Sequence, residues 1–535
     1  MGSEDAWMTS QLHSLQHPWS WNAAGLGRAL YILAGVVFFA VVYFEQSSKR
    51  RERLAKLPPG PFQWPYLGSL PHLFLSAGLR SSSKLRETVA ALETKHGPIM
   101  LLQIADLHVL VVSSGEFAKQ VLVTHDAEFF FRPRCGVGKY LGFGSADIAF
   151  AEGRHHWYLR KLCDTRLFSS ESFASNAPIR KHEAANMLRS LFEASQRGEA
   201  ICVRDAVTTF VRNSLCGMLL GTGHLDVENT SLHFTKETLT TLLDEVVAVA
   251  GDTTLRELTP GLNSWGGRDE QMKDLHLRLT KYFQVILDDR SLRLETNAEP
   301  EALVDVLLSL DEDQKLSSDA IMGILLDSLV GGIYPITATV EWALTELVRH
   351  PALLERVQME MTEVVGPYHI VHEAEFSQLS FFQAIVKETL RLHPAMAMSL
   401  PHMNKVATPV GDYEVPANTC VVMDYAAIGR DAKVWPKPLQ FDPRRFVDTD
   451  AASQIDTFKL LPFGYGRRGC PGANLGVILV QLSLAYLVQG FDWRPLKGQL
   501  PHDIHVQEAA GVFCFRSTPL TLRATPRLSS TLYEI

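Results

Sequence analysis

The residues best suited to chemistry lie in one short stretch near the C-terminus, Phe463 to Gly472 (FGYGRRGCPG). Glycines on both sides of Cys470 let the backbone pass close to a flat ligand and present amide N–H groups to the sulfur, which stabilises a thiolate. The helical run that begins at Ala473 directs its positive N-terminal end toward the same sulfur. Arg468 is placed to pair with a carboxylate. An isolated cysteine is usually a small core residue, but this pattern predicts a metal-ligating thiolate.

The pattern F-x-x-G-x-R-x-C-x-G resembles the haem-binding loop of the cytochrome P450 family. The resemblance runs from the N-terminal segment to the C-terminus and is to the membrane-bound eukaryotic, plant-type branch. It implies a mainly α fold with small β-sheets, the cytochrome P450 fold, behind one N-terminal transmembrane helix. The implied cofactor is haem b with Cys470 as the axial thiolate, a ligand that favours O–O cleavage. Arg468 is implied to contact a haem propionate and Phe463 to pack over the haem, with Gly464 and Gly472 in the same loop.

A second motif, Lys387 to Pro394 (KETLRLHP), places Glu388 and Arg391 three residues apart. On a helix these side chains share a face and can form a buried pair if a third group satisfies them. Alone, such a pair is common on protein surfaces and contributes little. The family resemblance supplies the third member from Pro443 to Phe446 (PRRF), namely Arg445. It implies a structural triad that serves folding and haem retention.

The resemblance implies two further contacts to the haem propionates. His402 matches the position where the family places an arginine or a histidine. A W-x-x-x-R helix matches the region of Arg160, with His156 where tryptophan is usual, and an imidazole N–H can replace an indole N–H. The other register, which pairs Trp157 with Lys161, stays open.

A long helix is predicted to begin near Ser317, and its centre departs from the family pattern A/G-G-x-D/E-T-T. Gly331 and Gly332 match the small residues that make room for dioxygen. Tyr334 stands at the acidic position and Pro335 at the first threonine, so the usual acid and alcohol for proton transfer are missing. Because proline removes a backbone donor, we expect the helix to open locally and admit water.

This departure leaves several reactions open. The first is monooxygenation with electrons from an NADPH-dependent reductase, in which a water chain, Tyr334, Thr337 or a polar group of the substrate delivers the protons. Proline at position 335 also resembles plant amino-acid N-hydroxylases that form oximes. The second is an O2-independent dehydratase or isomerase, although the uninterrupted cysteine loop argues against the allene-oxide-synthase type. The third is a non-enzymatic haem carrier or sensor.

The substrate is predicted to be a small or medium hydrophobic or aromatic molecule, because the segments implied to line the pocket are mostly apolar. These segments are Val137 to Asp147, Leu329 to Tyr334, Ala395 to Leu400 and Ala510 to Phe513. Since no dinucleotide or flavin fingerprint follows a strand, electrons are expected from a separate membrane-bound NADPH-cytochrome reductase.

The N-terminus predicts a membrane anchor. Ala29 to Phe44 carries no charge and, extended past Arg28 toward Trp21, approaches the roughly 20 residues that span a bilayer. Basic residues from Lys49 to Arg53 follow the span, which places the remainder in the cytoplasm. A cleaved signal peptide fits the sequence less well, because the basic residues follow the apolar segment instead of preceding it and no small-residue cleavage site follows. We expect a single-pass protein of the endoplasmic reticulum membrane.

Composition agrees with one large catalytic domain. The 535 residues carry 51 basic and 59 acidic side chains, a net charge of -8 without a polybasic region, so nucleic acid is not an expected partner. The seven cysteines include no C-x-x-C pair, which suggests neither a disulfide framework nor a zinc site. We expect an anchor over 1–48 with its span at about 23–44, a basic and Pro-rich hinge over 49–69, and a catalytic domain over 70–535.

Overall fold

The structure is a computed structural model, which describes residues 56–64, 68–77, 82–104, 106–221, 236–253, 268–296, 299–447 and 457–534. The chain divides into two units, Met1–Leu57 and Pro58–Ile535. The expected membrane span and the basic residues after it lie outside the described residues. The expected catalytic domain falls in the second unit.

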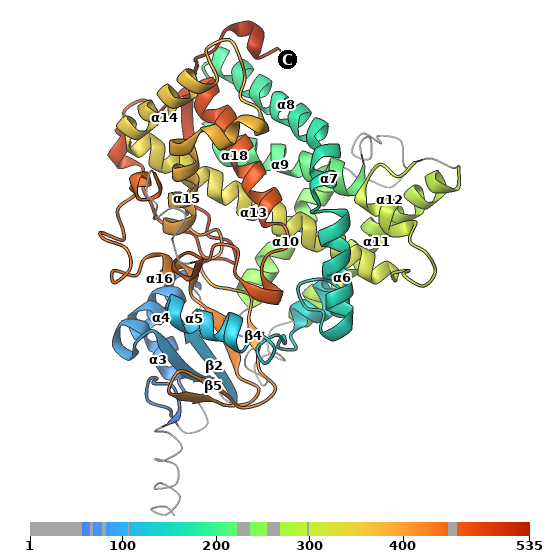
Figure 1. Ribbon diagram of the computed structural model, residues 1–535, viewed down its shortest axis with the longest axis vertical. Coiled ribbons are helices and arrows are strands. Elements are labelled where there is room, and N and C mark those ends of the chain that lie inside the picture. The colour runs from blue at the N-terminus through green and yellow to red at the C-terminus, as the bar shows by residue number, and fades with distance from the viewer. Residues whose placement is uncertain are drawn as a thin grey trace, which may run out of the picture. The chain divides into compact units, whose positions relative to one another are not determined.

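Helices make up most of the second unit (Figure 1). The helices before the centre of the chain are α3 Leu70–Ala77, α4 Ser82–His96, α5 Gly115–Lys119, α6 Gly153–Arg166, α7 Ser170–Ser175, α8 Ala177–Gln196, α9 Val203–Leu220 and α10 Lys236–Thr253. The later helices are α11 Arg268–Glu295, α12 Leu303–Leu308, α13 Ser318–Arg349, α14 Pro351–Val364, α15 Ser380–Leu392, α16 Tyr425–Gly429 and α18 Ala473–Gly490.

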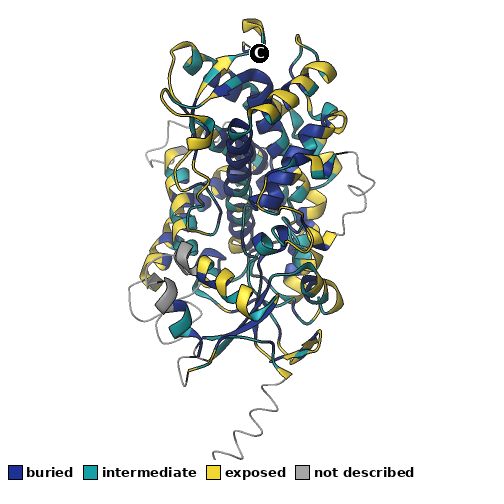
Figure 2. Ribbon diagram, turned by 90° about the vertical axis from the view of Figure 1, so that its left-hand side faces the viewer, coloured by how far each residue is buried: buried dark blue, intermediate teal, exposed yellow. Residues whose placement is uncertain are grey.

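Helix α13 is the centre of the hydrophobic core. It begins where the Ser317 hydroxyl accepts a hydrogen bond from the Ala320 N–H at 3.2 Å, an N-cap that satisfies a free backbone donor. Its side chains are buried almost all round, as expected of a helix enclosed by others. The core cluster joins α13 to side chains of α8, α9, α14, α15 and α18, and Figure 2 shows buried residues concentrated in these central helices.

The described residues also form three small sheets. The largest has the strand order β1-β2-β7-β4, with β1 Ile99–Ile104 antiparallel to β2 Leu107–Val112. Strand β2 runs parallel to β7 Cys420–Met423, which pairs with β4 His402–Met403. The second sheet has the strand order β3 Ile201–Cys202, β9 Thr521–Pro526 and β8 Phe491–Arg494. The third pairs β5 Thr408–Val410 with β6 Tyr413–Val415. The predicted fold class, mainly α with small sheets, is confirmed.

The second half of the expected hinge packs on the first sheet. The Leu101 N–H donates to the Pro59 carbonyl at 2.8 Å, and a Cβ added at Gly60 would lie 2.1 Å from the Leu101 carbonyl oxygen. Only glycine therefore fits at position 60. The globular unit begins at Pro58, which is earlier than the expected boundary at residue 70.

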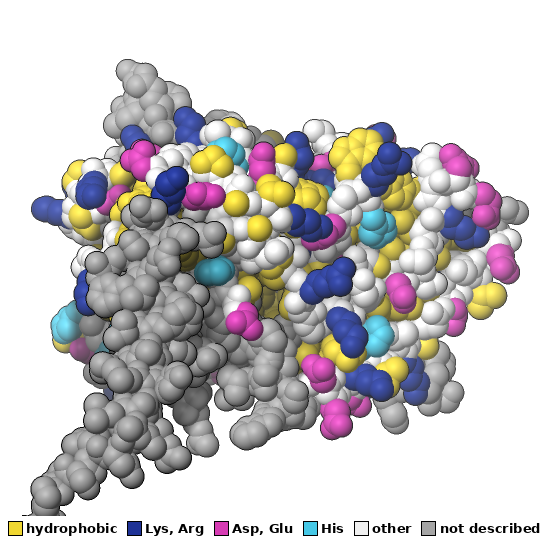
Figure 3. Space-filling view, turned by 90° about the horizontal axis from the view of Figure 1, so that it is seen from below, with side chains coloured by type: hydrophobic (Ala, Val, Ile, Leu, Met, Phe, Trp, Pro, Cys, Tyr) yellow, Lys and Arg dark blue, Asp and Glu magenta, His cyan; other side chains and the backbone are white. Residues whose placement is uncertain are grey.

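Two described helices are long and apolar enough to cross a membrane, α13 and α18. In their most apolar windows 61% and 67% of the residues are buried inside the protein, as in core helices of globular proteins. On the face drawn in Figure 3, basic and acidic side chains are interspersed with apolar ones, as on an ordinary protein surface.

Candidate active site

A cavity of about 1200 Å³ lies within the second unit. Its wall is mostly apolar and brings together segments that are far apart in the sequence: one face of α13, the cysteine loop, α6, and the stretches after α15 and before β9. All four predicted pocket segments contribute to this wall. The lining residues from them are Val137, Leu141, Gly142, Asp147, Val330, Gly331, Gly332, all of Ala395 to Leu400 and all of Ala510 to Phe513. A cavity of this size exceeds the roughly 300–1,000 Å³ of ordinary small-molecule sites.

The cysteine loop forms one wall of this cavity, and Phe463, Gly464, Arg468, Cys470 and Gly472 all line it. The Cys470 N–H donates to the Phe463 carbonyl at 2.8 Å, which closes the loop before α18 begins at Ala473. Gly464 has a φ of +66°, and a Cβ there would lie 2.9 Å from the Tyr425 hydroxyl oxygen. The glycine pattern is thus explained by backbone conformation and close approach.

Cys470 differs from the other cysteines of the cavity wall. It is accessible because it lines the cavity, and protein atoms nevertheless surround it. Burial raises the pKa of the Cys470 thiol, while the backbone N–H of Gly472 and the charge of Arg160 lower it. Cys420, in β7, is fully buried, and burial raises the pKa of its thiol to about 12. Cys470 is therefore the better placed of the two to act as a thiolate.

The guanidinium groups of two arginines near the loop form no ion pair with a described carboxylate. Arg468 donates to the backbone carbonyls of Phe130 and Ala151 at 3.0 and 2.6 Å, and also to that of Ile148. Arg132 donates to the carbonyls of Ala149, Leu400 and Pro401. Burial, together with the neighbouring Arg132, lowers the pKa of Arg468 to about 9. A carboxylate ligand in the cavity would relieve this crowding of positive charge.

The other predicted propionate contacts lie at the same end of the cavity. Arg160 lines it and donates to the Gly469 carbonyl at 2.6 Å. His156 and His402 are buried in the wall, and burial lowers the pKa of each imidazole to about 3, so both are neutral at pH 7. Trp157 is 64% exposed, which favours the register that pairs His156 with Arg160. Arg160 is also paired with Asp164 at 3.0 Å, whereas Arg132 and Arg468 are bonded to backbone carbonyls. An apolar cavity with an accessible cysteine and these two arginines fits a flat ligand that carries carboxylates, as haem does.

The face of α13 toward the cavity contains Gly331, Gly332, Pro335 and Thr339. A Cβ at Gly331 would meet nothing within 4 Å, whereas one at Gly332 would lie 2.5 Å from Leu215 of α9. Gly331 therefore leaves space in the cavity, and Gly332 also allows close helix packing. The helix runs unbroken through Pro335, contrary to the expected local opening, although the Gly331 carbonyl lacks its usual N–H donor.

Tyr334 and Thr337, predicted as candidate catalytic residues, lie outside the cavity wall. The Tyr334 hydroxyl donates to the Asp244 carboxylate at 2.6 Å, and its ring stacks on Phe513. Thr337 is fully buried and accepts a long hydrogen bond from Thr208 of α9 at 3.4 Å. This corrects the expected placement, because the two side chains turn toward α10 and α9.

The predicted triad is brought together at the end of α15. Arg391 donates to both carboxylate oxygens of Glu388 at 2.7 and 2.8 Å, and both side chains are completely buried. The Arg445 Nε donates to the same carboxylate at 3.3 Å. Arg391 also donates to the carbonyls of Gly429 and Pro438, so the buried guanidinium is satisfied from several elements. The predicted contacts are confirmed.

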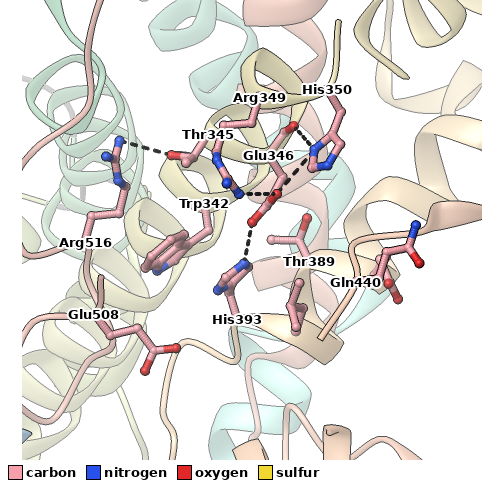
Figure 4. A network of polar contacts seen from close by, with 12 residues as sticks. Trp342, Thr345, Glu346, Arg349, His350, Thr389, His393, Gln440, Glu508 and Arg516 are labelled. Carbon is pink, nitrogen blue, oxygen red and sulfur yellow. Dashed lines mark hydrogen bonds and ion pairs between the residues drawn. The ribbon is translucent and has the colours of Figure 1, made fainter. Parts of the chain in front are cut away.

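A second polar network connects α13 with His393, the residue that follows α15 (Figure 4). The His393 ring stacks on Trp342 at a centroid distance of 4.1 Å, and its Nε2 lies 3.0 Å from Glu346 Oε1. The Trp342 indole N–H donates to the Cys514 carbonyl at 2.6 Å, and Arg516 donates to the Thr345 hydroxyl. These contacts fasten the C-terminal segment of the cavity wall to the central helix.

Sequence reasoning missed several polar residues of the cavity wall, namely Arg132, Thr339, Asp327 and Tyr425. Arg132 follows three phenylalanines and precedes a proline, and it belongs to none of the motifs identified in the sequence. The sequence did contain a signal for Thr339, because helical periodicity places it about two turns after Gly331 on the same face.

Comparisons with known proteins agree with this geometry. The family model described as "Cytochrome P450" matches residues 58–522. Flavonoid 3'-monooxygenase of Petunia hybrida is 33% identical over 94% of this chain and 98% of its own length. Trimethyltridecatetraene synthase of Zea mays is 34% identical over 94% of each chain. A zebrafish cytochrome P450 solved with abiraterone is similar in structure, with a TM-score of 0.67, 25% identity, and coverage of 82% of this chain and 98% of that chain.

Proposed function

The chain belongs to the cytochrome P450 family, whose members bind haem through a cysteine thiolate and receive electrons from NADPH through a reductase, and we propose that Cys470 is this thiolate. The chain is a haem-thiolate monooxygenase of hydrophobic small molecules. We further propose that it inserts one oxygen atom from O2 into a small hydrophobic or aromatic substrate. The proposal is carried by the Cys470 sulfur facing an apolar cavity with uncompensated arginines at the same end.

The residues of the cavity divide into two groups by role. Haem supplies oxygen activation when it is bound, and the thiolate ligand favours O–O cleavage. Arg132, Arg160 and Arg468 would hold its propionates, with the neutral imidazoles of His156 and His402 beside them. The apolar segments Ala395 to Leu400 and Ala510 to Phe513 would orient the substrate and exclude water.

We also propose that the N-terminal segment anchors the protein in the endoplasmic reticulum membrane, with the catalytic domain and its reductase on the cytoplasmic side. Phe62 and Trp64, early in the globular unit, are 67% and 49% exposed. Aromatic side chains favour the membrane interface, and these two follow the predicted anchor closely.

The function is tested on the full chain expressed in microsomes with an NADPH-cytochrome reductase. We expect the reduced protein to give the carbon-monoxide difference spectrum of a thiolate-ligated haem, and turnover of phenolic or terpenoid substrates to require both NADPH and O2. A haem spectrum without thiolate character would overturn the proposal. The panel of test compounds should also contain amino acids, oximes and peroxides.

The alternatives are separated by the requirements of turnover. Pro335 at the threonine position supports an amino-acid N-hydroxylase that forms an oxime, and this reaction also requires NADPH and O2. Turnover of an oxime or a peroxide without either would identify a dehydratase or isomerase instead. A thiolate spectrum that no compound of the panel alters would favour a haem sensor.

Replacement of Pro335 by threonine is expected to reduce the fraction of NADPH electrons released as peroxide by roughly tenfold, because it adds a hydroxyl that can transfer protons at the cavity wall. Pro335→Ala is the matched control, since it restores the backbone N–H without adding a hydroxyl. The measurement is peroxide formed per NADPH consumed. If both variants lower peroxide formation equally, the added hydroxyl is not the cause of the change.

A further inference from the structure

One backbone carbonyl of the cavity wall lacks the hydrogen-bond donor that a helix normally supplies. In an α-helix, the carbonyl of Gly331 would accept the N–H of the residue four positions later. That residue is Pro335, which has no N–H and whose ring crowds the carbonyl four positions before it. Helix α13 nevertheless continues through both positions. The Gly331 carbonyl is therefore an acceptor without its helical partner.

This carbonyl lies on the face of the helix that is open to the cavity. Gly331 and Pro335 both line the cavity, and they are one turn apart on the same face of α13. Gly331 is exposed, and a Cβ built on it would meet no described atom of another segment within 4 Å. The space beside the carbonyl can therefore hold part of a bound molecule.

The hydroxyl groups of α13 on either side do not supply the missing donor. Ser328 donates to the Ile324 carbonyl at 2.7 Å, and Thr339 donates to the Pro335 carbonyl at 2.8 Å. The Tyr334 hydroxyl donates to a carboxylate of α10 at 2.6 Å. Each hydroxyl has one proton to donate, so all three are already engaged.

A bound molecule can supply this donor. The neighbouring wall is mostly apolar and includes Leu215, Val330 and the segment Ala395 to Leu400. When an apolar molecule displaces water from this space, the carbonyl loses its hydrogen bond to water unless the molecule replaces it. A carbonyl oxygen only accepts, so the molecule must bring a donor, and a neutral O–H suits an acceptor without net charge.

We propose that the Gly331 carbonyl oxygen binds the hydroxyl group of an apolar alcohol or phenol and so positions the substrate in the cavity. This inference rests on the proposed function, because the cavity is that of the monooxygenase. It narrows the substrate class from hydrophobic molecules in general to those with a hydroxyl group on an apolar body. Pro335 determines the preference, because a proline at this position keeps the carbonyl without an internal donor.

The test compares two probes on the full haem-loaded chain. The first is 4-ethylphenol, and the second is 4-ethylanisole, whose ether oxygen can accept a hydrogen bond but cannot donate one. Affinities are measured by calorimetry on reduced protein without O2, so neither probe is consumed. The variant is Pro335→Ala, because the N–H of alanine would bond to the Gly331 carbonyl. Thr339→Val is the matched control, since it changes the same face of α13 and leaves Pro335 in place.

The unmodified chain should prefer the phenol, and Pro335→Ala is expected to lower the ratio of the two affinities by roughly fivefold, the effect of one hydrogen bond. Thr339→Val should change this ratio by less than about twofold, because its backbone still leaves the carbonyl free. An unchanged ratio in Pro335→Ala, or an equal fall in Thr339→Val, would overturn the inference. Absence of the thiolate spectrum from the unmodified chain would instead overturn the proposed function.

A second measurement needs no variant. In a crystal structure of the unmodified protein with bound 4-ethylphenol, the phenol oxygen is expected at about 2.5–3.0 Å from the Gly331 carbonyl oxygen. A water molecule on this carbonyl with the phenol oxygen elsewhere, or the phenol oxygen on the iron, would overturn the inference. Either result would leave the haem-thiolate assignment in place.

Discussion

Replacement of Cys470 by serine is expected to abolish the thiolate spectrum and to reduce turnover by more than about 100-fold, because a hydroxyl cannot replace the sulfur as a strong electron donor to iron. The variant should still fold, since the Cys470 side chain faces the cavity and its N–H bond to the Phe463 carbonyl involves only the backbone. The measurement is the carbon-monoxide difference spectrum, with bound haem quantified separately.

Cys420→Ser is the matched control for this prediction. Cys420 also lines the cavity, but it lies within β7 and its thiol is fully buried. We expect the control to keep the thiolate spectrum, with a modest loss of stability from a hydroxyl in an apolar core. If Cys470→Ser keeps the thiolate spectrum, or if only Cys420→Ser loses it, then Cys470 is not the haem ligand.

Glu388→Gln is expected to lower the free energy of unfolding by about 3–5 kcal/mol, because it leaves the buried guanidinium of Arg391 without its carboxylate. That loss is a large part of the roughly 5–15 kcal/mol that stabilises a typical domain, so bound haem should also decrease. Thermal unfolding followed by circular dichroism, together with haem content, measures the effect.

Arg444→Gln provides the control, since Arg444 neighbours Arg445 in sequence but its side chain is 65% exposed and pairs with Asp442. Exposed ion pairs contribute little, so the melting temperature should be almost unchanged. Similar destabilisation by the two variants would mean that the buried triad has no special importance for folding.

Most of the fold and much of the site could be predicted because their signals are local. The pair Glu388 and Arg391 lies on one helical face, and the conformation of the cysteine loop follows from its glycines. The long apolar pattern around α13 and the short apolar run of β1 also indicate their element types. These features depend on neighbours a few residues away, which a single sequence displays.

The directions of the side chains on α13 were not predicted correctly. At about 100° per residue, Thr337 lies about 240° from Gly331, whereas Thr339 lies about 80° from it. The helical period therefore distinguishes Thr339 from Thr337 without any knowledge of the family motif. The hydrogen bonds from the Ile148 and Ala149 N–H groups to Asp327 could not be predicted, because they join residues far apart in the chain.

The segment from Val506 to Phe513 lines the cavity and is fixed at both ends. Glu508 is tied to two arginines, and the Cys514 N–H and carbonyl are bonded to Ala395 and Trp342. Between these attachment points, Ala510 to Val512 make up a short tip of the cavity wall, where Gly511 has a φ of +152° and its backbone lies close to Gly251 of α10. A change of side chain at Ala510 or Val512 would therefore alter the space offered to a substrate while both attachment points stay in place.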